Sequence, residues 1–387
     1  MKYNFDDIAK RENTYSLKYD DIKVESPMWV ADMDFKTYPG VIKAIEDRVK
    51  IGAYGYSLIP DEYFDTIISW WQRRHNYTFL KEWMIFSNGV VCSLSSIVRK
   101  LTSVGENVLI QSPCYNIFYN SIINNGRNIV SNDLVYENGE YHIDFDDLDK
   151  KLANPQTSMM ILCNPHNPIG KIWTKEELEK IGFLAKKHNV IVVSDEIHCD
   201  FVNPSLHYVP FYSVNETNRE IGITLVSPGK TFNIAGLHTS CAIIKNPYLR
   251  HKVWRGLNTD EVAEPNFFAI ASSIGAYKDG DIWVDELNEY IYNNKKIFID
   301  MLNKNIPSIH VVPSNATYLL WVDISSLHID SVSFSEYLLK TVSLRVSDGK
   351  EYGHNGDNFI RINMATSKEN VIKGANKLIN AILNLNK

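Results

Sequence analysis

Residues 190–198 read VIVVSDEIH, a short apolar run that ends in polar and charged residues. Runs of the same kind recur at residues 107–110, 158–162 and 222–226, with longer amphipathic segments between them. This alternation is typical of parallel strands joined by crossover helices. Because the runs have no polar face, we expect both faces of the sheet to be buried. The sequence therefore predicts an α/β fold.

The segments around these strands have the marks of helices. Thr174 and Glu177 form a capping-box pattern at the start of a segment that continues to His188. Beyond about Asp279 the alternation of short apolar runs and amphipathic segments ends. There we expect a helix at 283–304, a strand at 316–322, a helix near 334–340, a strand at 358–364 and a C-terminal helix. That order is typical of a smaller α+β unit.

The length of 387 residues is about twice that of a usual single domain, so we predict two domains. We place a large, mostly parallel-sheet domain at 46–279 and a smaller α+β domain at 1–45 plus 280–387. Periodicity defines no element in the first forty residues.

Composition excludes several classes of protein. The net charge is -6 and no long basic run occurs, which argues against a nucleic-acid binder. The polar N-terminal residues lack the apolar core of a signal peptide, and no apolar run reaches the roughly 18 residues of a membrane span. The five cysteines are odd in number, widely spaced and without a CxxC pair, so most are interpreted as small buried apolar residues. We expect a cytoplasmic protein.

Polar residues that follow the predicted strands are the candidates for chemistry. In open parallel sheets, ligands bind beyond the carboxyl ends of the strands. Four such segments stand out: Asn88-Gly89-Val90-Val91, Asn164-Pro165-His166-Asn167-Pro168-Ile169-Gly170, Ser194-Asp195-Glu196-Ile197-His198 and Ser227-Pro228-Gly229-Lys230-Thr231-Phe232.

Gly89 and Lys230 each allow a functional and a plain reading. Gly89 opens a predicted helix, and a helix N-terminus can bind a phosphate, although a simple turn into a helix fits as well. Lys230 lies three residues after Ser227 at the end of an apolar strand, where burial can make its amine nucleophilic. A solvated loop lysine is the alternative.

Asp195 and Arg361 carry the charges that a ligand could use. Asp195 follows four apolar residues, so it should lie deep and need a positive or hydrogen-bonding partner, such as a protonated pyridine nitrogen. A helix cap or an internal salt bridge would also satisfy it. Alternation in 358–364 puts Arg361 on one face with Phe359 and Asn363. Arginine on a strand suits bidentate binding of a carboxylate, and an exposed arginine on an edge strand is the alternative.

Together the segments resemble fold-type I enzymes that use pyridoxal 5'-phosphate (PLP), in the class I and II aminotransferase superfamily, over nearly the whole chain. Longer strings resemble its MalY/PatB branch of carbon-sulfur β-lyases, which includes cystathionine β-lyases. The strings are PMWVADMDF at 27–35, YGY at 54–56, CNPHNP at 163–168, SDEIH at 194–198 and KTFNIAGL at 230–237. The resemblance implies a large PLP-binding domain and a smaller domain.

The resemblance also implies roles for matching residues at the cofactor. Lys230 would form the Schiff base and then remove the Cα proton of the substrate. Asp195 would pair with the pyridinium nitrogen, Asn167 would hydrogen-bond the phenolic oxygen, and Tyr115 would stack on the ring.

Further implied contacts concern the phosphate and the substrate. Gly89, Val90 and Ser227 would hold the phosphate, and Tyr56 would reach the phosphate of a neighbouring subunit, which implies a homodimer. Arg361 would bind the substrate α-carboxylate. The aromatic candidates for the side-chain pocket are Trp29, Tyr54 and Tyr318.

Three positions depart from the wider family. His198 stands three residues after Asp195, where many aminotransferases carry tyrosine, so it is our candidate at the cofactor there. His238 stands eight residues after Lys230, where arginine is frequent, and Gly229 replaces a serine that is frequent in this branch. The first two differences point away from ordinary transaminases.

The implied reaction is α,β-elimination from L-cystathionine or a related cysteine S-conjugate, giving pyruvate, ammonia and a thiol. An aminotransferase is the main alternative, because it needs the same Lys230, Asp195 and Arg361. A metal site formed by His166, His198 and His238 is a third possibility that we do not favour, since it would leave the other residues without a role. A regulatory role through binding a transcription factor would be an addition to catalysis.

Overall fold

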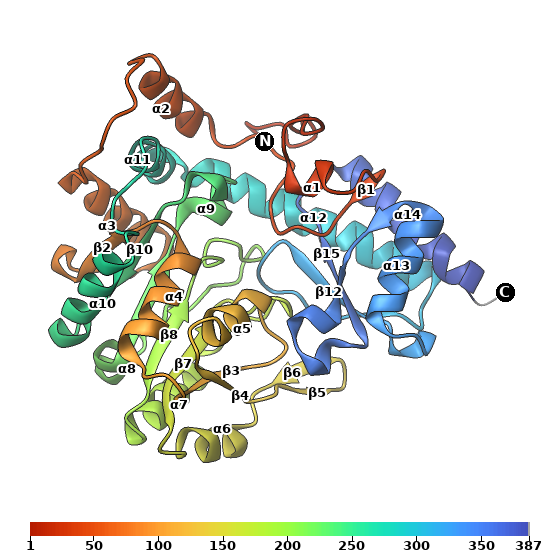
Figure 1. Cartoon of the computed structure of the whole chain (residues 1–387). Helices are drawn as coiled ribbons and strands as arrows, with labels where there is room; N and C mark the ends of the chain where they lie inside the picture. Colours follow the sequence, from red (N-terminus) through yellow and green to blue (C-terminus); the bar gives the residue numbers. More distant parts are fainter. Residues whose placement is uncertain (386–387) are drawn as a thin grey trace.

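The computed structural model describes residues 1–385. Its centre is a seven-stranded sheet in the order β2-β10-β9-β8-β7-β3-β4 (Figure 1). The strands are β2 (Met84–Ser87), β3 (Asn107–Ile110), β4 (Asn128–Ser131), β7 (Thr157–Cys163), β8 (Ile191–Asp195), β9 (Gly222–Val226) and β10 (Ser240–Ile243). Only β10 runs antiparallel to its neighbours among these strands. The predicted α/β fold is confirmed.

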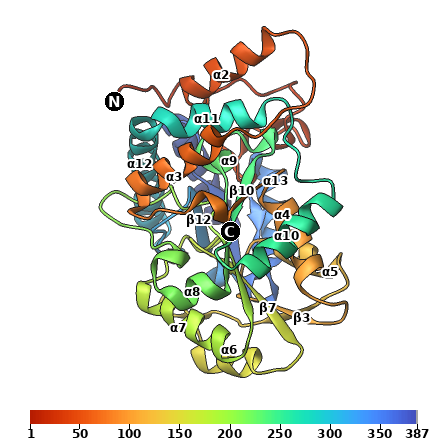
Figure 2. The ribbon, with the colours of Figure 1, turned by 90° about the vertical axis from the view of Figure 1, so that its left-hand side faces the viewer.

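Helices cover both faces of this sheet. On one side lie α4 (Val90–Leu101), α5 (Asn116–Ile123) and α10 (Pro247–Thr259), and on the other α3 (Asp61–His75), α7 (Lys175–Lys187) and α8 (Glu216–Ile221) (Figure 2). Along β7, Met159 and Ile161 contribute to one core, and Met160 and Leu162 to the other. Burial on both faces explains why the strand sequences are continuously apolar. The capping box predicted at Thr174 is present at the start of α7.

The C-terminal part forms a second sheet with its own core. The order is β11-β12-β15-β14, all antiparallel. The strands are β11 (His310–Val311), β12 (Leu319–Asp323), β14 (Ser347–Asp348) and β15 (Phe359–Asn363), packed with α13 (Ser331–Val342) and α14 (Lys368–Leu385). On β15, Ile360 and Ile362 lie in the core of this sheet, whereas Phe359 packs in the core of the large one. The predicted alternation is therefore confirmed.

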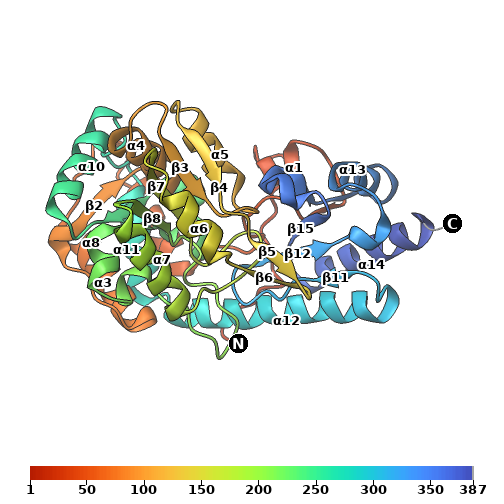
Figure 3. The same cartoon turned by 90° about the horizontal axis from the view of Figure 1, so that it is seen from below.

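One long helix joins the two cores. Helix α12 (Asp281–Asn305) begins close to Asp279, where the sequence pattern was predicted to change, and runs along both parts of the molecule (Figure 3). Its first half contributes Trp283 and Leu287 to the core of the large sheet, and its second half contributes Phe298 and Leu302 to the smaller core. Because one rigid helix enters both cores, the two sheets are held in a fixed relation.

The remaining elements are short or peripheral. They are α1 (Leu17–Asp20), α2 (Pro39–Val49), α6 (Phe145–Leu152), α9 (Pro228–Thr231), α11 (Ala269–Asp279), the hairpin β5 (Val135–Glu137) and β6 (Glu140–His142), and the parallel pair β1 (Ser26–Pro27) and β13 (Leu344–Arg345). Within the first forty residues β1 pairs with β13, whereas Phe5, Met33 and Phe35 lie in the core of the large sheet. Helix α2 packs on α11 across the predicted boundary at residue 45. The exact domain boundaries stay a prediction.

No helix among the described residues is long and apolar enough to cross a membrane. The five cysteines are free thiols, and four of them are buried, as predicted.

Candidate active site

A cavity of about 340 Å³ lies where β2, β7, β8 and β9 end. Of the predicted site residues, those that line it are Gly89, Val90, Tyr115, Asn167, Asp195, His198, Ser227 and Lys230. They come from positions up to 141 residues apart by sequence number, since Gly89 precedes Lys230 by that count. The parallel topology brings them to one edge of the sheet, as expected for an open α/β sheet.

Lys230 lies on α9, directly after β9. Ser227 caps this short helix: its hydroxyl accepts from the Gly229 N–H at 3.0 Å and donates to the Thr239 carbonyl at 2.6 Å. The Lys230 amine donates to the carbonyl of Ala31. Burial, and then the positive charge of Arg361, lower the pKa of Lys230 to about 8. Its amine is therefore a far better nucleophile and base near neutrality than an ordinary lysine.

Asp195 ends β8 and is buried beside the same cavity. Its Oδ1 accepts from the backbone N–H of Ile197 at 3.1 Å. Burial raises the pKa of Asp195 to about 6, and the Ile197 N–H and the charge of Lys230 limit that rise. The described residues give this carboxylate no salt-bridge partner within 4.0 Å, so a cationic ring nitrogen in the cavity would stabilise it.

Arg361, on the second sheet, contacts Asn167 in the wall of the cavity and does not line the cavity itself. Strand β15 lies between β12 and β14, and Arg361 is buried, so the alternative of an exposed edge-strand arginine is wrong. Its guanidinium donates to Asn167 Oδ1 at 3.2 Å and to the Trp29 carbonyl at 3.0 Å. Its Nε has no hydrogen-bond partner among the described residues. These bonds use two of the five N–H groups, so donors that include Nε–H are still available for an anion.

His198 and Tyr115 complete the walls. His198 is buried, and its Nδ1 has no hydrogen-bond partner within the described part of the chain. Burial, helped by the charges of Lys230 and Arg361, holds the pKa of His198 well below its usual value, so the ring is neutral. Burial also raises the pKa of the Tyr115 phenol. Both rings lie beside the cavity without carrying a charge into it.

The start of α4 offers room for an anion. Gly89 has φ +116°, and a Cβ placed there would meet only His238 Nδ1, at 3.9 Å. Open space therefore adjoins the first turn of a 12-residue helix, whose free N–H groups and positive dipole end attract a phosphate. The phosphate role of Gly89 remains a prediction.

Four predicted residues do not line the cavity: Arg361, Trp29, Tyr54 and Tyr56. The Trp29 ring lies 3.5 Å from the Arg345 guanidinium, although its carbonyl contacts Arg361. Tyr54 and Tyr56 lie in the segment after α2, where their side chains are 59% and 100% exposed. The roles given to these residues remain predictions.

Other cavity residues were not singled out from the sequence. The Ala31 carbonyl accepts from Lys230 and, at 2.8 Å, from the Tyr318 hydroxyl. Cys92 also lines the cavity, and so does His238, which the sequence singled out as a family departure and for the metal hypothesis but not for the cofactor site. Ala31 lies within the string at 27–35, but a backbone carbonyl leaves no signature in residue type.

The three histidines of the metal hypothesis do not form a cluster within residues 1–385. His166 is buried under the turn after β7, where its Nε2–H donates to the Pro113 carbonyl at 2.8 Å. That hypothesis is wrong for these residues, because His166 is used in the structure of the turn.

Comparison with known proteins agrees with this geometry. The model of the family "Aminotransferase class I and II" matches residues 29–378. The chain belongs to this family. Cystathionine beta-lyase PatB of Bacillus subtilis is 36% identical over 97% of this chain and 98% of that protein. Protein MalY of Escherichia coli is 31% identical over 98% and 99%.

A solved structure extends the likeness to three dimensions. The PLP-bound C-S lyase from Staphylococcus hominis superposes with a TM-score of 0.92 at 32% identity, covering 98% of this chain and 99% of that one. The predicted fold type and the resemblance to the MalY/PatB branch are thereby confirmed.

Proposed function

We propose that this protein is a PLP-dependent carbon-sulfur β-lyase acting on L-cystathionine or related cysteine S-conjugates. The observation that carries the proposal is that Lys230 and Asp195 line one cavity and Arg361 is bonded to Asn167 in its wall. The chain is also related to a cystathionine β-lyase and to a PLP-bound C-S lyase. The balanced reaction consumes the conjugate and one water and gives a thiol, pyruvate and ammonia.

The residues present fit PLP. We assign the covalent link to Lys230, the ring nitrogen to Asp195, and the phenolic oxygen to Asn167 and His198. Support comes from polar groups that otherwise lack partners: the His198 Nδ1 and the carboxylate of Asp195, which forms no salt bridge in the described residues.

The remaining assignments place Tyr115 against the ring and Gly89, Val90 and Ser227 around the phosphate. The open space at Gly89 beside the N-terminus of α4 supports the phosphate position. When bound, PLP supplies an electron sink that stabilises negative charge at the substrate Cα.

The chain itself orients the substrate and moves one proton. Arg361 binds the α-carboxylate, because its buried guanidinium is held against Asn167 in the cavity wall and its Nε has no partner among the described residues. The Lys230 amine, once released by the substrate amino group, removes the Cα proton, since its pKa of about 8 matches proton transfer near neutrality. Loss of the thiolate from Cβ completes the elimination.

Product analysis tests this function against the aminotransferase alternative. Purified holoenzyme is given cystathionine or an S-alkyl cysteine without any keto acid, and pyruvate and thiol are measured. We expect both in equal amounts. If turnover of the substrate requires an added keto acid, the lyase proposal is wrong and transamination is favoured. Lys230→Ala is the control, and it should release neither product and show no absorption from covalently bound cofactor.

We further propose a cytoplasmic homodimer in which Tyr56 contacts the cofactor phosphate of the neighbouring subunit. The segment from α2 to residue 58 exposes several apolar side chains: Ile42, Val49, Ile51, Tyr54, Tyr56 and Leu58. A fully exposed tyrosine in such a segment gains most from a second copy of the chain. Sedimentation should show a dimer, and Tyr56→Ala should weaken PLP affinity without removing the covalent link.

A further inference from the structure

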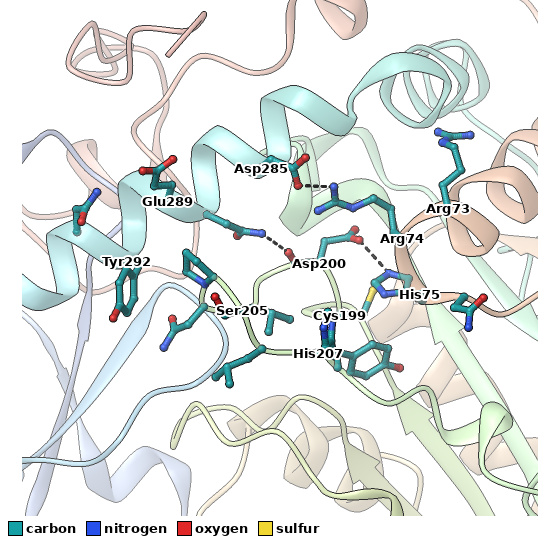
Figure 4. Close-up of a pocket in the computed structure, with 18 residues that line it drawn as sticks. Arg73, Arg74, His75, Cys199, Asp200, Ser205, His207, Asp285, Glu289 and Tyr292 are labelled. Atoms are coloured by element: carbon teal, nitrogen blue, oxygen red, sulfur yellow. Dashed lines mark hydrogen bonds and ion pairs between the residues drawn. The ribbon is translucent and has the colours of Figure 1, made fainter.

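A second cavity, of about 860 Å³, lies between the end of α3, the segment after β8 and the middle of α12 (Figure 4). At its wall His75, Cys199 and Asp200 come together. Their possible ligand atoms all lie within 4.8 Å of one another. The three residues come from two distant parts of the chain, and none of them lines the cofactor cavity.

We propose that His75, Cys199 and Asp200 form a binding site for a thiophilic divalent cation such as Zn²⁺. Imidazole nitrogen, thiolate sulfur and carboxylate oxygen are the ligands that zinc prefers. With metal–ligand bonds of 2.0 to 2.3 Å, ligand atoms of a tetrahedral site are roughly 3.3–3.8 Å apart. Binding would therefore draw the ligand atoms, which now lie within 4.8 Å of one another, closer together by up to about 1.5 Å.

Outer contacts already hold the ligands. The Trp70 indole N–H donates to Asp200 Oδ1 at 3.0 Å, and the Thr231 hydroxyl donates to Oδ2 at 2.8 Å. Hydrogen bonds of this kind orient a ligating carboxylate and still leave a lone pair for the metal. The His75 ring is fixed by Trp71, with centroids 4.6 Å apart. The cation would replace the present contact between His75 Nε2 and Asp200 Oδ1, which measures 3.0 Å.

Charge also balances at the site. The Cys199 thiolate and the Asp200 carboxylate together neutralise a divalent cation, and neutral His75 adds no charge. Binding therefore releases the thiol proton to solvent and leaves Nε2 of His75 unprotonated. The nearby Arg74 is occupied by Asp285, with Nη1 and Oδ1 2.5 Å apart. The adjoining cavity can supply a water as the fourth ligand.

The experiment titrates Zn²⁺ into dialysed holoenzyme and measures bound metal, with Co²⁺ as a spectroscopic probe of thiolate ligation. We expect one cation per chain and a thiolate-to-cobalt absorption band. Cys199→Ala and His75→Gln should weaken binding by about a hundredfold, and Thr231→Val, which removes an outer contact, by about tenfold. Cys241→Ala is the matched control, because Cys241 is a buried thiol on β10 outside the cluster, and it should bind like the wild type.

Two results would overturn the proposal. One is equal metal uptake by Cys199→Ala and Cys241→Ala, both shown to be folded by circular dichroism and cofactor absorption. The other concerns the wild type alone, so it holds even if a variant fails to fold: cobalt uptake without a thiolate band, or no uptake at all, excludes the site.

Discussion

The two cavities lie on opposite sides of one short segment and differ in how their polar groups are used. Asp195 and His198 line the smaller cavity, whereas Cys199 and Asp200, the next residues along the chain, line the larger one. In the smaller cavity His198 Nδ1 has no partner among the described residues, and Asp195 has no cation. In the larger one Asp200 is bound by His75, Trp70 and Thr231. The smaller cavity therefore offers polar groups that are free for a ligand, whereas a cation at the larger one must replace the contact between His75 and Asp200.

Two carboxylates five residues apart give the strongest test of this contrast. Asp195→Asn should lower kcat by about 10²- to 10³-fold, because it removes charge stabilisation at the reacting centre. Its effect on stability should be small, since Asp195 forms no protein ion pair. Asp200→Asn should instead lower the free energy of unfolding by about 1–3 kcal/mol, because it disturbs a buried carboxylate that is hydrogen-bonded to Trp70, His75 and Thr231. Steady-state kinetics and thermal unfolding of both variants measure the two effects.

One result would contradict this contrast between Asp195 and Asp200. If Asp200→Asn lost as much kcat as Asp195→Asn while remaining fully stable, the second cavity would take part in the chemistry.

A second test compares His75, at the wall of the larger cavity, with His166, which is buried in the turn after β7. His75 has a carboxylate partner, whereas His166 has only the Pro113 carbonyl, and burial lowers the pKa of His166 to about 4. In the unfolded chain the value is about 6.5, so the unfolded state binds the proton first. The stability that neutral His166 contributes is complete above about pH 6.5 and is lost as the pH falls toward 4, in total about 3 kcal/mol.

His166→Asn should therefore flatten the dependence of Tm on pH between these limits, whatever it does to stability at neutral pH. Identical slopes for the variant and the wild type would show that His166 does not titrate with unfolding.

A third test concerns Lys230, whose amine must be neutral to bond with the cofactor. With a pKa of about 8, the rate of PLP uptake by the cofactor-free protein should rise with pH and level off above about 8. A lysine with the ordinary value of about 10.4 would show a rise that continues for two further units. Arg361→Gln removes a nearby positive charge and should move the midpoint to higher pH. Absorption during mixing measures both curves, and an unmoved midpoint would argue against the Arg361 contribution.

The sequence predicted the parts of the fold that depend on local pattern. Strands β3 and β9 have the predicted bounds, because burial on both faces leaves an uninterrupted apolar run. The residues that follow β7, β8 and β9 could be placed at one cavity, because parallel strands end at one edge of the sheet. The sequence also predicted which residues of β15 share a face, since each face of this strand packs into a different core.

Contacts between distant segments could not be predicted in the same way. The N-terminal segment is held by the Asn363 side chain, which donates to the carbonyls of Val30 and Asp32 at 2.7 and 2.6 Å. The acceptors are backbone carbonyls, which every residue has, so the amino-acid sequence does not predict these bonds. The pairing of His75 with Asp200 spans 125 positions and has no local pattern. Tyr54 and Tyr56 are exposed in the single chain, and only a second subunit could give them the predicted role.

The smallest effect is expected for an arginine of the larger cavity, compared with the arginine near the smaller one. Arg74 pairs with Asp285, whose side chain is 64% exposed, so solvent screens the pair and Arg74→Gln should change the free energy of unfolding by less than about 1 kcal/mol. Its kcat/KM should stay at the wild-type value. Arg361→Gln, at a buried guanidinium, should raise KM for amino-acid substrates by about tenfold or more, because a bidentate contact to the carboxylate is lost. Both variants are measured on the same substrate. If kcat/KM falls as far for Arg74→Gln as for Arg361→Gln, the larger cavity also contacts the substrate. The assignment of different roles to the two cavities would then be wrong.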